Sequence, residues 1–477
     1  MAAELQQGAG RSGLLRNFSL TFSANIVSML VSVLMVFFLS RGMGVERYGY
    51  WQLYLLYCSY TSFVHLGLAD GFYLRHSGER ATDLAAGLFS GLFRLACFLA
   101  ACFCLLSALY YSAVQGRADI LALTGLATLF SIPRVFIQFG WQALARFREN
   151  ALIIVFERLL FLLGALAFAF LKGQSFHQLI AIDIGAKVVA LFVAVYMGRD
   201  LVVQASLPWA QLKGEVKADI LSGMSLMLAT ISSSLLIGLN QLVIKGQWGI
   251  QTYSRIALTL SLSNFLMIFI NALALVLLPF IRGQEEERNR RLYMRSRRIL
   301  ILILVLGLNV YFPLRCFANF WLPRYSPGIV YMAILFPVCI FESKNQLLTN
   351  TFLKNYRRER DILKANLLSL ALCGLLLWLG ARVFANLFFV VLSLLVSIAF
   401  RSLISEYYLS RVSGDFQLGR NLLELLIAAA FVLSQYGLGG WMGALSYALL
   451  SLAYLLFERQ LLQELLGLLL GRLRRRS

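Results

Sequence analysis

The sequence predicts an all-α polytopic membrane protein with about fourteen transmembrane helices. Of its 477 residues 60% are hydrophobic and only 14% are charged, whereas soluble domains carry about 25% charged residues. The mean hydropathy is +0.75. Many apolar runs reach the ~20 residues that a helix needs to cross a ~30 Å hydrocarbon layer. A water-soluble fold has no interior large enough to bury so many runs, so the chain is expected to fold in lipid.

The predicted spans follow the apolar runs and the charged or glycine-rich breaks between them. The first run is too long for the core of a signal peptide and lacks an A-x-A-like cleavage site before Arg41, so it is kept as a span. An even number of spans places both termini on one side. The spans lie at 17–40, 48–69, 84–111, 120–145, 151–171, 176–197, 220–243, 256–281, 299–317, 329–353, 362–380, 383–408, 422–437 and 441–457.

Lysine and arginine are divided unevenly between the two sets of connections. With a cytoplasmic N-terminus, 28 lie in inside segments and 9 in outside segments. The positive-inside rule therefore predicts a multi-pass membrane protein with both termini in the cytoplasm. This topogenic role accounts for the net charge of +20 and argues against nucleic acid as a partner, because no soluble domain presents the basic residues.

An internal repeat divides the chain. The pattern G-x-x-x-Y occurs at 44–48 and again 205 positions later, and a polar triplet at the inside end of the fourth span (138, 142, 146) recurs 208 positions later in the tenth. Pro133 and Pro337 lie inside these same two spans, where proline favours a kink.

Six crossings in each half predict a parallel pseudo-repeat, related by an axis along the membrane normal. The predicted domains are an N-terminal six-helix lobe at 1–200, a cytoplasmic linker at 201–219, a C-terminal six-helix lobe at 220–411, two additional helices at 412–460 and a basic amphipathic tail at 461–477.

Six basic residues lie inside predicted spans, where each charge costs about 2.5–3.5 kcal/mol and normally faces a partner or a cavity. Arg94 and Arg134 lie near mid-depth with no acid within one helical turn, so they are the best candidates for a cationic cavity that binds phosphate or acidic sugars. Asp183 and Lys187 are spaced i, i+4 and can pair on one helix face. The second half holds Lys344 and Arg401 with Glu342 and Glu424.

The candidate binding set is Arg94, Arg134, Arg158, Lys187 and Arg255, and Asp183 is the candidate for ion coupling. For each of these residues an interhelical ion pair or a snorkelling side chain is the alternative interpretation. No Walker, dinucleotide or metal-ligand pattern occurs, so neither a cofactor nor a metal is expected.

The segments at 15–18, 40–50 and 66–71 resemble the O-antigen and polysaccharide flippase family of the MATE-like MOP exporter superfamily. That family shows R-x-L-G-x-x-x-Y-G-x-Y followed by L-G-L-x-x-G, and here Met43 stands where leucine is usual. The resemblance implies alternating access and, as cargo, an undecaprenyl-diphosphate-linked oligosaccharide moved from the cytoplasmic to the periplasmic leaflet. The location expected for such a protein is a bacterial inner membrane, and the expected further partners are membrane lipids, H⁺ or Na⁺ and other polysaccharide-assembly proteins. No enzymatic activity is expected, because the sequence shows neither a large outside loop nor convergent acidic or histidine residues.

Three alternatives compete with this interpretation. A peptidoglycan lipid-precursor flippase would share both the architecture and a cationic cavity. A multidrug exporter of the same superfamily would need an acidic cavity for cationic drugs. A membrane-embedded polymerase or acyltransferase would need a large outside loop or convergent acidic or histidine residues, although His65 and Asp70 match H-x-x-x-x-D within the L-G-L turn. The sugar composition of the cargo, the coupling ion and the oligomeric state stay open.

Overall fold

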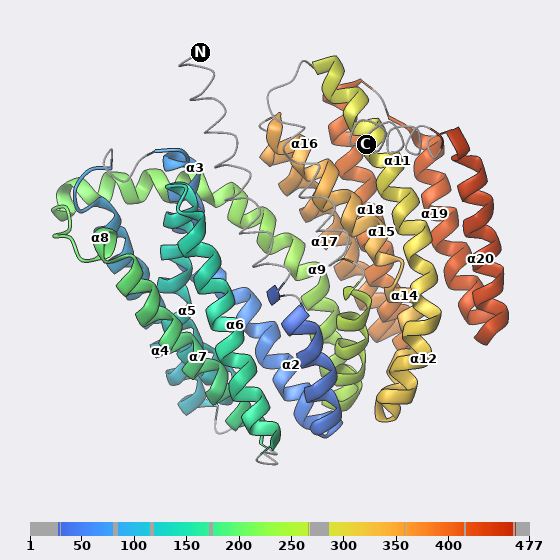
Figure 1. The fold of residues 1–477 in the computed structure, drawn as a ribbon, viewed down its shortest axis with the longest axis horizontal. Helices are drawn as coiled ribbons and strands as arrows, with labels where there is room; N and C mark the ends of the chain where they lie inside the picture. Colours follow the sequence, from blue (N-terminus) through green and yellow to red (C-terminus); the bar gives the residue numbers. More distant parts are fainter. Residues whose placement is uncertain are drawn as a thin grey trace, which may run out of the picture. The chain divides into compact units, whose positions relative to one another are not determined.

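The computed structural model describes residues 27–28, 30–79, 84–114, 119–170, 175–265, 267, 286–356, 358–414, 416–460 and 463. These residues form helices and no β-strand (Figure 1). Among the described residues, ten helices are long and apolar enough to cross a membrane, or eleven if the bent pair Pro323–Ile329 and Met332–Asn355 forms one span. The prediction of an all-α multi-pass membrane protein is confirmed, whereas the count of fourteen spans stays a prediction. Part of the first span and all but one residue of the basic tail lie outside the described residues.

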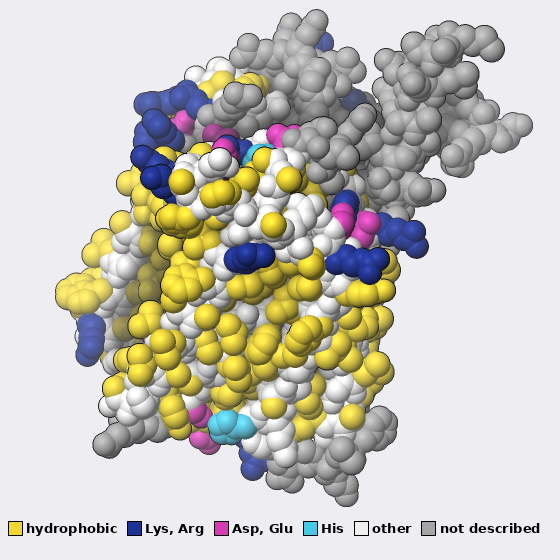
Figure 2. Space-filling model, turned by 90° about the vertical axis from the view of Figure 1, so that its left-hand side faces the viewer, with side chains coloured by type: hydrophobic (Ala, Val, Ile, Leu, Met, Phe, Trp, Pro, Cys, Tyr) yellow, Lys and Arg dark blue, Asp and Glu magenta, His cyan; other side chains and the backbone are white. Residues whose placement is uncertain are grey.

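The surface has the pattern of a protein in lipid. Figure 2 shows one face with a broad hydrophobic band and with lysine and arginine gathered mainly beyond one of its rims. Such a band matches the hydrocarbon layer, and the basic rim matches a headgroup region.

The chain divides into two compact units, with the division between Ser234 and Leu235. This division falls inside α9 (Trp209–Ser263), a helix that continues from the first unit into the second. Three consecutive serines, 232–234, immediately precede the division. The sequence places the interlobe linker earlier, at 201–219, and these domain limits stay a prediction.

In the first unit, α5 is the central helix. It packs against α2, α3, α4, α6 and α7, and its span is 56% buried, more than any other span of this unit. The central position of α5 places its polar residues among four other long helices. The elements are α2 (Val45–Tyr60), η1 (Thr61–His65), α3 (Leu68–His76), α4 (Leu88–Ala113), α5 (Asp119–Ala143), α6 (Phe147–Phe170), α7 (Phe176–Met197) and α8 (Arg199–Val202).

In the second unit, α18 has the corresponding central position. It contacts α14, α15, α16, α17 and η5, and its span is also 56% buried. The elements are α11 (Glu286–Gly307), η3 (Leu308–Val310), α12 (Tyr311–Trp321), η4 (Pro323–Tyr325), α13 (Ser326–Ile329), α14 (Met332–Leu335), α15 (Val338–Ser343), η5 (Lys344–Thr349), α16 (Asn350–Asn355), α17 (Glu359–Trp378), η6 (Leu379–Val383), α18 (Leu387–Ser413), α19 (Leu418–Leu433), η7 (Ser434–Leu438) and α20 (Gly440–Phe457).

The repeated G-x-x-x-Y pattern occupies equivalent positions in the two units. Gly44 caps the start of α2, and Gly249, with φ 78° and ψ 175°, breaks the helical path inside α9. Such a conformation is essentially restricted to glycine. The following tyrosines, Tyr48 and Tyr253, are both fully buried. In each unit a break in the helix is therefore followed, one turn later, by a buried aromatic anchor.

The two prolines behave differently. Pro133 lies within α5, which continues as a helix on both sides of it. Pro337 immediately precedes α15, but the 53° bend of the tenth span lies earlier, between Ile329 and Met332. The proline correspondence therefore does not mark the bend in the second unit.

The L-G-L-x-x-G segment brings α3 against the start of α9. A Cβ atom on Gly71 would lie 1.8 Å from the carbonyl oxygen of Asp219, and one on Gly223 would lie 2.1 Å from the carbonyl oxygen of Gly67. Only glycine permits backbones to approach this closely. Arg75 extends the contact, because its guanidinium lies 2.6 Å from Asp219 Oδ1 and 2.7 Å from Glu215 Oε2.

Candidate functional site

A polar cluster lies in the interior of the first unit, well inside the spans. Tyr54 of α2 donates a hydrogen bond of 2.6 Å to Asp183 Oδ2 of α7. Lys187 forms an ion pair with the same carboxylate oxygen, and its Nζ lies 3.3 Å from the Tyr54 hydroxyl. The i, i+4 pairing that the sequence predicts is therefore present, and a third residue from another helix completes it.

Arg134 of α5 forms a second pair in the same unit. Its Nη1 lies 2.8 Å from Glu157 Oε2 of α6 and 3.0 Å from Gln138 Oε1. The carboxylate that the local sequence of Arg134 lacks thus comes from a neighbouring helix. The Nε of Arg134 is buried and has no hydrogen-bond partner among the described residues. A buried guanidinium N–H without a partner is costly, which makes it a candidate donor to a ligand.

The remaining predicted binding residues are dispersed. Arg94 lies in the first turns of α4, where it is exposed and donates to Ser206 Oγ at 3.1 Å and to the Gln204 carbonyl at 3.3 Å. This position is nearer the end of the helix than the mid-depth expected from the sequence. Arg158 is exposed on α6 beside Glu157. Arg255 belongs to the second unit, where its backbone contacts Gly328.

The second unit contains a buried charge network that is only partly apparent from the sequence. Lys344 Nζ lies 3.0 Å from Glu406 Oε2, 2.5 Å from Glu424 Oε2 and 2.8 Å from Asn421 Oδ1. Arg297 pairs with the other oxygen of Glu406 and lies 2.7 Å from Glu424 Oε1 and 3.0 Å from Asn421 Oδ1. All five side chains are at most 4% exposed. Two cations and two carboxylates therefore neutralise one another.

Two charged members of this network, Arg297 and Glu406, are not among the intramembrane charges that the sequence indicates. Arg297 appears in the sequence as one of several arginines of an inside loop, because the ninth span is predicted to begin at residue 299. In the structure it lies on α11, which begins at Glu286. Glu406 is a single acid near the end of the twelfth span. The sequence feature that could have pointed to Arg297 and Glu406 is the charge balance, because Lys344 and Glu424 lie inside apolar runs and require buried partners.

Nearby, Arg401 of α18 pairs with Glu342 of α15, which also accepts a hydrogen bond from Gln346. The H-x-x-x-x-D histidine, His65, is buried against the edge of Phe139, with ring centroids 6.5 Å apart. Within the described part of the chain, no three His, Cys, Asp or Glu side chains are grouped as metal ligands.

Two compact helical units that carry charged residues inside apolar spans define a class, the polytopic helical membrane proteins. No protein-family model matches the sequence, and no curated protein does. Solved structures do match. The lipid II flippase MurJ in an inward closed conformation superposes with a TM-score of 0.66 at 11% identity, over 93% of this chain and 99% of MurJ.

Two further structures are similar. The MATE transporter VcmN of Vibrio cholerae, solved as a mutant, has a TM-score of 0.59 at 17% identity, over 85% of this chain and 98% of that chain. A MOP-superfamily transporter from Pyrococcus furiosus, described as having a binding pocket of reversed polarity, has a TM-score of 0.54 at 11% identity, over 83% of this chain and 95% of that chain. The chain therefore has the MATE-like fold of MOP-superfamily transporters and flippases.

Proposed function

We propose that this chain is a flippase that moves an undecaprenyl-diphosphate-linked oligosaccharide from the cytoplasmic to the periplasmic leaflet of a bacterial inner membrane by alternating access. The observation that carries the proposal is Arg134, a buried guanidinium whose Nε has no partner among the described residues. Guanidinium groups bind phosphate oxyanions through paired N–H donors. Arg158, next to Glu157, gives the surrounding helices a surplus of positive charge.

The same charge sign argues against export of cationic drugs, which would favour a surplus of carboxylates in the cavity. A peptidoglycan-precursor flippase is the second candidate, since the MurJ fold extends over 93% of this chain. Both candidates carry a lipid diphosphate, so the cargo sugar has to be identified by experiment.

The function is tested by deletion and complementation in the source bacterium. Deletion should make the lipid-linked oligosaccharide accumulate on the cytoplasmic leaflet while its synthesis continues, and the wild-type chain should restore export. The variant Arg134→Gln with Glu157→Gln leaves no uncompensated charge, so we expect normal protein levels and little export. Arg411→Gln is the control, because this exposed arginine only contacts Tyr407. Accumulation of lipid II instead would favour the second candidate, and normal export after deletion would reject both.

A further prediction concerns the ion that drives the exchange, for which Asp183 and Lys187 are the candidates. If the phosphate of the cargo attracts Lys187, the Asp183 carboxylate loses its cation and binds a proton or Na⁺ more readily, since a nearby opposite charge favours the ionised form. The ligand would then shift the equilibrium between states through its different affinity for them.

The double variant Asp183→Asn with Lys187→Gln separates this role from a static bridge. It removes both charges, and the Tyr54 hydroxyl keeps an amide oxygen to bond. We expect normal insertion and transport that no longer responds to a pH or sodium gradient in proteoliposomes. Tyr54→Phe is the control, because it keeps both charges. Gradient-dependent transport by the double variant would reject the coupling role.

A further inference from the structure

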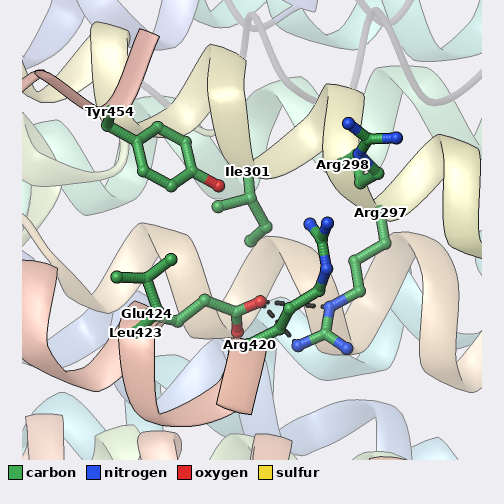
Figure 3. A pocket seen from close by; sticks show the side chains of 7 residues that line it. All are labelled: Arg297, Arg298, Ile301, Arg420, Leu423, Glu424 and Tyr454. Carbon is green, nitrogen blue, oxygen red and sulfur yellow. Dashed lines mark hydrogen bonds and ion pairs between the residues drawn. The ribbon is translucent and has the colours of Figure 1, made fainter. Parts of the chain in front are cut away.

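A small pocket, partly open to the outside, lies in the second unit between α11, α19 and α20 (Figure 3). Its charged lining residues are Arg297, Arg298, Arg420 and Glu424. Figure 3 shows the three arginines on one side and Tyr454 with Leu423 on the other. Arg297 and Glu424 are the two lining residues that also belong to the buried charge network. Arg134, Asp183 and Lys187, which the proposed function uses, do not line the pocket.

Two of the arginines are held by one buried carboxylate. Glu458 is 1% exposed, and its Oε2 lies 2.9 Å from Nε and 2.6 Å from Nη2 of Arg298. Its Oε1 lies 2.9 Å from Nη1 of Arg420. These bonds fix both guanidinium groups, while Nη1 of Arg298 and Nη2 of Arg420 make no bond within the described part of the chain. The side chains of the two arginines are 28% and 32% exposed, so a ligand can reach them.

The charge balance of the pocket favours an anion. Arg297 and Lys344 are neutralised by Glu406 and Glu424 in the network behind it. Arg298 and Arg420 share the single carboxylate of Glu458, which leaves one positive charge in excess among the described residues that line the mouth. Two guanidinium groups with N–H donors to spare are the usual receptors for a phosphate.

The apolar residues around the pocket indicate which kind of phosphate-bearing molecule it binds. Leu422 and Leu426 of α19 and Leu452 and Leu456 of α20 are exposed on the same helices that line the pocket. In a membrane these faces contact acyl chains. From the predicted orientation, the pocket lies at the cytoplasmic ends of α19 and α20, beside the middle of α11, and close to the headgroups. A lipid can therefore place its phosphate on the arginines and its chains on the leucines, whereas free phosphate would use only the first contact.

We infer that this pocket binds the phosphate of an anionic phospholipid of the cytoplasmic leaflet, held by Arg298 and Arg420. The site is separate from the proposed cargo pathway in its residues, and its occupancy is expected in the absence of cargo. The inference can fail without affecting the proposed function, because binding is measured on the purified chain without transport.

Binding is measured by native mass spectrometry and thermal unfolding of the full chain in detergent with added phosphatidylglycerol, phosphatidylcholine of the same acyl chains, or inorganic phosphate. Phosphatidylglycerol should bind at least about tenfold more tightly than phosphatidylcholine, which corresponds to ~1.4 kcal/mol, and should raise the unfolding temperature. Equal binding of the two lipids would overturn the inference. So would an equal shift with millimolar inorganic phosphate, which would assign the site to free phosphate.

The variant Arg298→Gln, Arg420→Gln, Glu458→Gln removes the three charges together and leaves no buried carboxylate unpaired. It should lose the preference for phosphatidylglycerol. Arg199→Gln is the matched control, since it lowers the net charge by the same amount at an exposed position that only stacks on Tyr196, and it should keep the preference. If both variants lose the preference for phosphatidylglycerol equally, the preference comes from general surface charge and the inference is rejected. Arg420→Gln alone keeps the ion pair between Arg298 and Glu458, and it should lose part of the preference for phosphatidylglycerol. This single variant tests the inference if the triple variant does not fold.

Discussion

Replacing Lys344 with methionine should destabilise the second unit by about 3–5 kcal/mol, because it leaves a buried carboxylate without its cation. Lys344 is fully buried and bonds both Glu406 and Glu424, which would then share only Arg297. The measurement is reversible unfolding in mixed micelles, followed by tryptophan fluorescence.

The matched variant is Lys344→Met with Glu424→Gln. It keeps one cation and one carboxylate, Arg297 and Glu406, so the network stays neutral. We expect it to recover most of the lost stability, since the cost arises from the uncompensated charge and not from the missing side chain. A double variant as unstable as the sum of the two single variants would contradict this explanation.

Gly71→Ala and Gly223→Ala should each destabilise the first unit by more than about 3 kcal/mol, at or above the upper end for overpacked sites. The added methyl groups would lie 1.8 Å and 2.1 Å from backbone carbonyl oxygens, and a backbone cannot move aside as a flexible side chain can. The amount of folded, monodisperse protein extracted from membranes measures the effect.

Gly185→Ala is the control for these variants. Gly185 lies within α7 and has no atom within 4 Å of an added Cβ. Alanine there should be neutral or slightly stabilising, because glycine in a helix interior is less favourable than alanine. If Gly71→Ala folds as well as Gly185→Ala, α3 and α9 do not pack as the structure shows.

The sequence predicts the features that depend on residues close together along the chain. Apolar runs define most of the spans, and the i, i+4 spacing of Asp183 and Lys187 identifies a pair that the structure contains. The partners of Arg134 and Lys344 are different, because they come from other helices. Which helix face meets which neighbour depends on the rotation of each helix in the bundle, and one sequence does not specify it.

Errors in the predicted ends of the spans account for the other differences between the sequence prediction and the structure. Arg297 is hidden in an arginine-rich segment because apolar content alone places the start of the span after it, although α11 begins earlier. Arg94 is expected at mid-depth because its span is predicted from residue 84, whereas α4 begins at Leu88. Shifts of a few residues at a helix end change the depth of a side chain by one turn, which is enough to change its environment.

The continuity of α9 across the two units has a mechanical consequence. Its early turns are fixed to the first unit by the glycine contact with α3, and its later turns belong to the second unit. Ser232 donates back to the Leu228 carbonyl at 2.8 Å, and the Tyr60 hydroxyl donates to the Ser234 carbonyl at 3.1 Å. Hydroxyl groups on helix carbonyls compete with the main-chain bonds and favour bending. The serine triplet is therefore, together with the break at Gly249, a place where α9 itself can bend at low energetic cost.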